Sequence, residues 1–72
     1  MTEITLLAPL RFDQGIGYWT GEPDAEALAR ALAAVPQARE VEREVSDTGV
    51  TLRGPEEAVR EEARLLRSAG LE

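Results

Sequence analysis

The feature of this sequence that most restricts its fold is a β-hairpin that leads directly into a helix in the C-terminal half. Val41 and Val45 alternate with glutamates in the first strand. Val50 and Leu52 alternate with polar residues in the second strand, after a turn-like segment at residues 46–49. Val45 and Val50 share one face only if the connection holds an even number of residues, because a slip of one residue turns every side chain to the other face. The sequence therefore predicts a hairpin with Val45 opposite Val50.

Arg43 is the one residue of this hairpin outside the alternating pattern, because it shares a face with Val41 and Val45. An arginine in such a place most often runs past the edge of the sheet and pairs with an acid. The alternative is an anion site for a partner's carboxylate or a ligand's phosphate. On the other face, the register puts Glu42 across from Arg53, where we expect a cross-strand ion pair.

A second helix follows the hairpin. Gly54-Pro55-Glu56-Glu57 predicts its start, because proline suits the first helical position and acidic residues oppose the positive end of the helix dipole. Val59, Ala63 and Leu66 then recur on one face as an apolar stripe.

The end of this helix is also marked in the sequence. Gly70 stands where a residue with positive φ commonly closes a helix. We therefore expect a Schellman motif in which Leu71 packs back on Leu66.

The N-terminal half carries weaker strand signals. An alternation with a period of two predicts one strand, whose alternating residues are Ile4, Leu6, Ala8 and Leu10. Leu7 adds an apolar group on the second face of this strand, and Pro9 marks an edge strand or the strand's end because it cannot donate to a ladder. After turn residues at 13–15, residues 16–20 predict a short second strand that folds back as a hairpin.

The first helix is predicted to open at Gly21-Glu22-Pro23-Asp24, with Pro23 at its first position. Its apolar stripe consists of Leu28, Leu32 and Val35, with Ala25 and Ala29 beside it. Pro36 disfavours helical geometry at the residue before it, so the helix ends near Ala34.

These elements predict one α+β domain over residues 1–72, in the order β(β)αββα. An antiparallel sheet of three to four strands, with both helices on one face, gives a two-layer sandwich. A core this small contributes only about 3–5 kcal/mol of net stability, so self-association as a dimer is the expected supplement.

Charge and composition exclude several classes of protein. The net charge of −6 disfavours nucleic acid and anionic membranes as partners, because both repel an acidic surface. With no Cys and no His, disulfides are excluded and the usual ligands of a metal centre or haem are missing, so we expect no metal and no cofactor. No apolar run is long enough to span a bilayer and the first residues lack a basic signal region, which favours a cytoplasmic protein.

The chain also has no Lys and no Asn, and every basic residue is Arg. This composition resembles that of short proteins from Thermus- and Deinococcus-type bacteria. The resemblance implies a thermophilic bacterial source, for which few thermolabile side chains are suited, and it implies no activity and no functional residue.

A glycine-rich segment lies between the N-terminal strands and the first helix. Its spacing, G-x-G-x-x-x-G over Gly15, Gly17 and Gly21, is one residue longer than the dinucleotide-binding fingerprint, and the next strand is too charged for a buried parallel sheet. We interpret these glycines as turn residues. The alternative is a small-molecule site, in which this loop and the start of the first helix bind an anionic ligand.

The three aromatic residues, Phe12, Tyr18 and Trp19, fall within eight positions. One interpretation is that Phe12 and one of the other two complete the core. Neighbouring strand residues point to opposite faces, so Tyr18 and Trp19 cannot both be buried on one face. The other interpretations are a surface for a partner or for self-association, and a pocket for a small ligand.

No catalytic residue is identified in the sequence. The serines and threonines have no His or Lys to act as a base. The paired carboxylates at positions 40, 42 and 44, and at 56, 57, 61 and 62, are interpreted as solvated faces because acid–base catalysis needs one desolvated member. The prediction is therefore a non-enzymatic interaction module, homodimeric or bound to another protein, whose candidate surface residues are Leu7, Phe12, Gly15, Gly17, Tyr18, Trp19 and Arg43.

Overall fold

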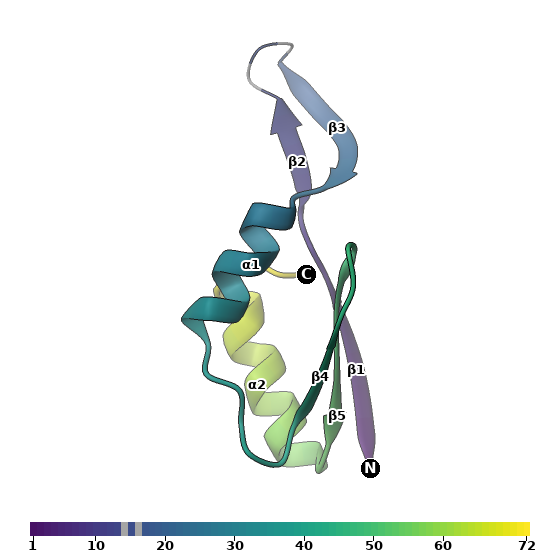
Figure 1. Cartoon of the computed structure of the whole chain (residues 1–72), viewed down its shortest axis with the longest axis vertical. Coiled ribbons are helices and arrows are strands. Elements are labelled where there is room, and N and C mark those ends of the chain that lie inside the picture. The colour runs from purple at the N-terminus through teal and green to yellow at the C-terminus, as the bar shows by residue number, and fades with distance from the viewer. Residues whose placement is uncertain (14, 16) are drawn as a thin grey trace.

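The fold is described by a computed structural model that covers residues 1–13, 15 and 17–72, apart from the side chains of Asp13 and Trp19. Its elements, in chain order, are β1 (Thr2–Leu7), β2 (Leu10–Asp13), β3 (Tyr18–Pro23), α1 (Ala25–Ala34), β4 (Glu42–Val45), β5 (Gly49–Gly54) and α2 (Glu56–Ser68). An antiparallel sheet in the order β1-β5-β4 has both helices on one face, while β2 and β3 form a separate two-stranded ribbon that projects beyond it (Figure 1). The predicted α+β two-layer sandwich is confirmed. We call the ribbon, residues 10–23, the arm.

The C-terminal hairpin has the predicted register. Val45 pairs with Val50, and Glu42 pairs with Arg53. The Ser46 N–H donates to the carbonyl of Gly49 over 2.9 Å and closes the turn. Gly49 is required by close packing, because a Cβ at this position would lie 2.0 Å from the backbone oxygen of Leu6 on β1.

The predicted N-terminal strand is divided in two. β1 ends at Leu7 and pairs with β5, whereas Leu10 belongs to β2 in the arm. The division falls at Pro9, which has no N–H to continue the ladder. Its carbonyl instead accepts a hydrogen bond of 2.8 Å from the Asp24 N–H at the start of α1. The predicted sheet of up to four strands is thus a sheet of three and a ribbon of two.

The second strand of the arm lies later in the sequence than predicted. We expected residues 16–20, and β3 covers Tyr18–Pro23. Ile16, together with Gln14 of the predicted turn, lies outside the described residues. Gly17 and Gly21 have positive φ values of 73° and 80°, which explains why glycine is found at the turn and within β3.

Both helices begin after the proline that was expected to be their first residue. Helix α1 begins two residues after Pro23, and α2 begins one residue after Pro55. Pro23 is the last residue of β3, and Asp24 is the N-cap of α1, with a carboxylate oxygen that accepts from the Ala27 N–H at 3.0 Å. Pro55 is the N-cap of α2, in an extended conformation, and its carbonyl accepts from the Val59 N–H at 3.0 Å. The first-position assignment was wrong because Pro23 still belongs to β3, and because Pro55 has the extended backbone and the acceptor role of an N-cap.

The core lies between the helices and the three-stranded sheet, and it is entirely aliphatic among the described side chains. Its members are Leu6, Ala8, Leu28, Ala31, Val35, Val41, Val50, Leu52, Val59, Ala63, Leu66 and Leu71. The stripe predicted for α2 is confirmed. In α1 the small inward residue is Ala31, and the predicted Ala25 and Ala29 are exposed. Phe12 does not complete the core as expected, because β2 carries it into the arm.

The predicted Schellman motif closes α2. The Leu71 N–H donates to the Leu66 carbonyl and the Gly70 N–H to the Arg67 carbonyl, both at 3.1 Å. Gly70 has a φ of 118°, and Leu71 is buried against the core.

We predict that Leu66→Ala lowers the free energy of unfolding by about 2–5 kcal/mol, because it removes a fully buried side chain and leaves a cavity. Leu65→Ala is the matched control, since Leu65 is the adjacent helical residue and is exposed. Urea denaturation at one protein concentration measures both values. Equal losses in the two variants would contradict the assignment of the helical face.

Candidate interaction surface

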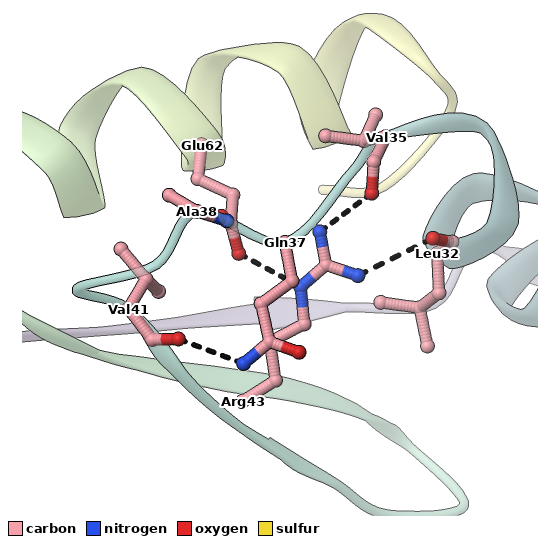
Figure 2. A network of polar contacts seen from close by, with 7 residues as sticks. All are labelled: Leu32, Val35, Gln37, Ala38, Val41, Arg43 and Glu62. Atoms are coloured by element: carbon pink, nitrogen blue, oxygen red, sulfur yellow. Dashed lines mark hydrogen bonds and ion pairs between the residues drawn. The ribbon is translucent and has the colours of Figure 1, made fainter.

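A buried ion pair joins α2 to β4 beneath the end of α1 (Figure 2). The Arg43 Nε donates to Glu62 Oε2 at 2.7 Å, and the exposed fractions of the two side chains are only 10 % and 2 %. The second carboxylate oxygen of Glu62 accepts from the Ala38 N–H at 2.6 Å. Burying a charge is costly unless a counter-charge and hydrogen bonds satisfy it, and both oxygens of Glu62 are satisfied in this way.

The rest of the Arg43 guanidinium is bound to the end of α1. Nη2 donates to the Val35 carbonyl at 2.7 Å and Nη1 to the Leu32 carbonyl at 3.2 Å. These carbonyls belong to the negative end of the helix, where an arginine is favoured. Gln37 adds one further bond, from Nε2 to the Val41 carbonyl at 2.7 Å. The connection between α1 and β4 is thereby held by three side chains, those of Arg43 on β4, Glu62 on α2 and Gln37 in the connection itself.

This pair gives Arg43 a structural role. Each of its three nitrogen atoms donates to a protein acceptor, and both Glu62 oxygens accept from a protein donor. The acid that the sequence analysis expected beside Arg43 is therefore present. An external anion would have to displace these contacts.

The interpretation of Glu62 as part of a solvated acidic face was wrong. Glu62 is buried because it lies three residues after Val59 and four before Leu66, which places it on the apolar stripe of α2. That position was readable from the sequence, as was the unusual position of Arg43. The signal that could have identified the pair is that Arg43 and Glu62 carry opposite charges on apolar faces that pack against each other.

The face of the sheet opposite the helices is polar. Arg53 lies between two carboxylates, with Glu3 on β1 at 2.7 Å and Glu44 on β4 at 2.8 Å. The hydrogen bonds that Arg53 donates to Glu3 and, to a smaller extent, to Glu44 raise the pKa of Arg53 above its ordinary value. Glu42 is the register partner of Arg53, as expected, but the ion pairs of Arg53 go to these other two acids. This face therefore has the character of a solvated surface.

The arm has the opposite character. Leu10, Phe12 and Tyr18 are 48 %, 44 % and 58 % exposed, so three large apolar groups lie on a ribbon of ten strand residues. Leu7 and Val45 are also exposed, and they end β1 and β4 at the end of the sheet nearest the arm (Figure 1). Exposed apolar side chains that gather in one region mark an interaction surface more often than scattered ones do.

Local polar contacts give the arm its shape. The Thr20 hydroxyl donates to the Arg11 carbonyl at 3.1 Å and accepts from the Glu22 N–H at 3.2 Å. Arg11 and Glu22 also form an exposed ion pair at 3.6 Å. Since a two-stranded ribbon alone is marginally stable in water, contact with another surface would stabilise the arm.

The structure brings most of the predicted surface residues together. Phe12, Gly15, Gly17, Tyr18 and the backbone of Trp19 lie in the arm or its turn, where Trp19 is the register partner of Phe12. One of the neighbouring aromatics Tyr18 and Trp19 was predicted to be buried. Tyr18 is exposed, and the side chain of Trp19 lies outside the described part of the structure. The remaining two residues are elsewhere: Leu7 lies beside the base of the arm, and Arg43 lies inside the body.

The start of α1, proposed above as part of an anion site, already has a negative group. The Asp24 carboxylate caps the helix through the Ala27 N–H, and Glu26 follows in the first turn. A second anion at this position would meet both charges.

No family model, curated protein or solved structure matches this chain. In the part of the chain that the structure describes, no helix has the length and apolar character needed to cross a membrane. Within that same part, no cluster of acidic residues is arranged to hold a metal ion.

We predict that Arg43→Leu lowers the free energy of unfolding by about 3–5 kcal/mol, because Glu62 stays buried without its counter-charge. Arg53→Leu makes the same chemical change on the neighbouring strand, where the partners are exposed to solvent, and it should cost much less. The double variant Arg43→Leu/Glu62→Leu should recover part of the loss. Urea denaturation of the four proteins tests this, and no recovery in the double variant would contradict the pairing.

Proposed function

We propose that this protein is a non-enzymatic, cytoplasmic protein-interaction module that forms a homodimer and presents its arm to a protein partner. The observation that carries the proposal is the exposure of Leu10, Phe12 and Tyr18 on a ribbon none of whose described side chains belongs to the core. Tyrosine and phenylalanine are enriched at protein interfaces because they bury a large area with few rotatable bonds.

The arrangement of the titratable groups supports a role without catalysis. The buried carboxylate, Glu62, is saturated by Arg43 and the Ala38 N–H. A general acid or base needs a group in a cleft whose proton can reach a substrate. The chain has no His, Cys or Lys to take that role in its place.

The contacts at the start of α1 favour a protein partner over a small anionic ligand. A pocket for an anion would use the Gly15–Gly21 loop and the start of α1, where Asp24 already occupies the cap. The apolar groups of the arm instead suit a partner that covers them with apolar surface. A thermal-shift panel of nucleotides, amino acids and organic acids that raised the melting temperature would favour the ligand instead.

We predict that Tyr18→Ser abolishes capture of a partner from the native lysate, because it removes the most exposed of the three large apolar groups on the arm. Leu65→Ser is the matched control, since it removes an exposed apolar side chain on α2, outside the arm. Capture by immobilised protein, followed by mass spectrometry, measures the outcome. A partner that both variants retain equally would contradict the role of the arm.

A further inference from the structure

Backbone hydrogen bonds at the end of β1 define the open edge of the three-stranded sheet. The Ala8 N–H donates at 2.8 Å to a carbonyl of the β4–β5 turn. The N–H and carbonyl of Leu7 point the other way and bond to the carbonyl and N–H of Glu72 at 2.8 and 2.9 Å. Because this direction alternates along an antiparallel strand, the N–H and carbonyl groups of Glu3 and Thr5 also face the open edge.

The two edges of the sheet are protected to different degrees. At the β4 edge the Gln37 side chain binds the Val41 carbonyl, and three of the four residues of β4 are charged. β1 pairs with β5 in a regular register over Thr2–Leu7, which has no proline and no bulge and a single charged residue, Glu3. Proteins usually block an exposed edge with prolines, bulges and several charged residues, and an edge with few of these features is suited to bind another strand.

We propose that the β1 edge pairs antiparallel with β1 of a second copy, with the two-fold axis at Ile4, so that the dimer has one continuous six-stranded sheet. Glu3 of each copy would exchange both backbone hydrogen bonds with Thr5 of the other. This proposal rests on the homodimer proposed above and specifies its interface.

The contacts of the monomer select this register over its neighbours. A register shifted one way pairs Glu3 with Glu3 of the second copy, which sets like charges directly opposite each other. A register shifted the other way pairs Glu3 with Leu7, whose backbone groups are already bound to Glu72. In the proposed register Glu3 lies beside an uncharged threonine, while its carboxylate keeps the ion pair with Arg53 at 2.7 Å.

Ile4 would gain most from this pairing. It is half-buried at the margin of the core, on the helix-covered face of β1. At a two-fold axis it faces Ile4 of the second copy in the pair whose side chains approach most closely. The arms would then leave the dimer at opposite ends, because β1 runs in opposite directions in the two copies and the arm follows its C-terminal end (Figure 1). Both arms would stay available to a partner.

Amide hydrogen exchange of the unmodified full chain tests the edge directly. In the dimer, the amides of Glu3 and Thr5 should be protected as strongly as those of Ile4 and Leu6, and their protection alone should fall on dilution. Sedimentation equilibrium on the same samples gives the oligomeric state. A dimer whose Glu3 and Thr5 amides exchange freely would overturn this interface and leave the homodimer standing, whereas a monomer at every concentration would overturn both.

Two matched variants test the register. Thr5→Glu places a carboxylate opposite Glu3 of the second copy, and the two-fold axis repeats this contact, so the dimer has two like-charge pairs. We expect the dimerisation constant to weaken roughly tenfold, and by less at high salt. Thr51→Glu adds the same charge on the central strand, away from the edge, and should leave dimerisation unchanged. Both variants break the same hydroxyl hydrogen bond, Thr5 to Thr51 at 3.0 Å, so only the position of the charge differs. Equal dimerisation constants for the two variants would overturn the proposed register.

Discussion

The rest of the fold depends on the buried pair between Arg43 and Glu62. Helix α1 and strand β4 are joined by a connection without regular structure, and this pair fixes that connection to α2 through backbone groups at Leu32, Val35 and Ala38. A purely apolar contact between α1 and the sheet would allow several orientations of similar energy. An ion pair with directional hydrogen bonds allows far fewer, because any other orientation leaves a buried charge without its partners.

Sequence patterns predicted the scaffold well where local chemistry determines it. The hairpin register follows from the alternation around Val45 and Val50, and the end of α2 follows from Gly70 and Leu71. Both depend on residues close together in the chain. The first helix was predicted to end near Ala34 and does so, and Pro9 follows the end of an edge strand as expected. The prediction failed in assigning Leu10 to the same strand, because the alternating run is divided at Pro9 between two sheets. Nothing in the alternation itself distinguishes a strand in the sheet from a strand that leaves it.

The candidate surface was predicted in outline for a similar reason. The aromatic cluster and the glycines are adjacent in sequence, so any hairpin brings Phe12 close to Tyr18 and Trp19. The exposure of Phe12 and Tyr18 was not predictable, because it depends on whether the hairpin packs on the helices or leaves them. Among the described side chains the core is aliphatic and includes neither Phe12 nor Tyr18. Arg43 was singled out correctly as unusual, but its partner lies on an element 19 residues away and is recognised only in three dimensions.

The separation of the arm from the core has a consequence for how this protein can change over time. In the described part of the chain, the buried apolar residues all lie outside residues 10–23. Substitutions in the arm are therefore expected to change the surface proposed to bind a partner at little expense in folding stability, whereas substitutions in the body are constrained by close packing. Selection can then act on binding and on stability almost independently. Among relatives we expect a preserved body and arms that diverge in sequence and length.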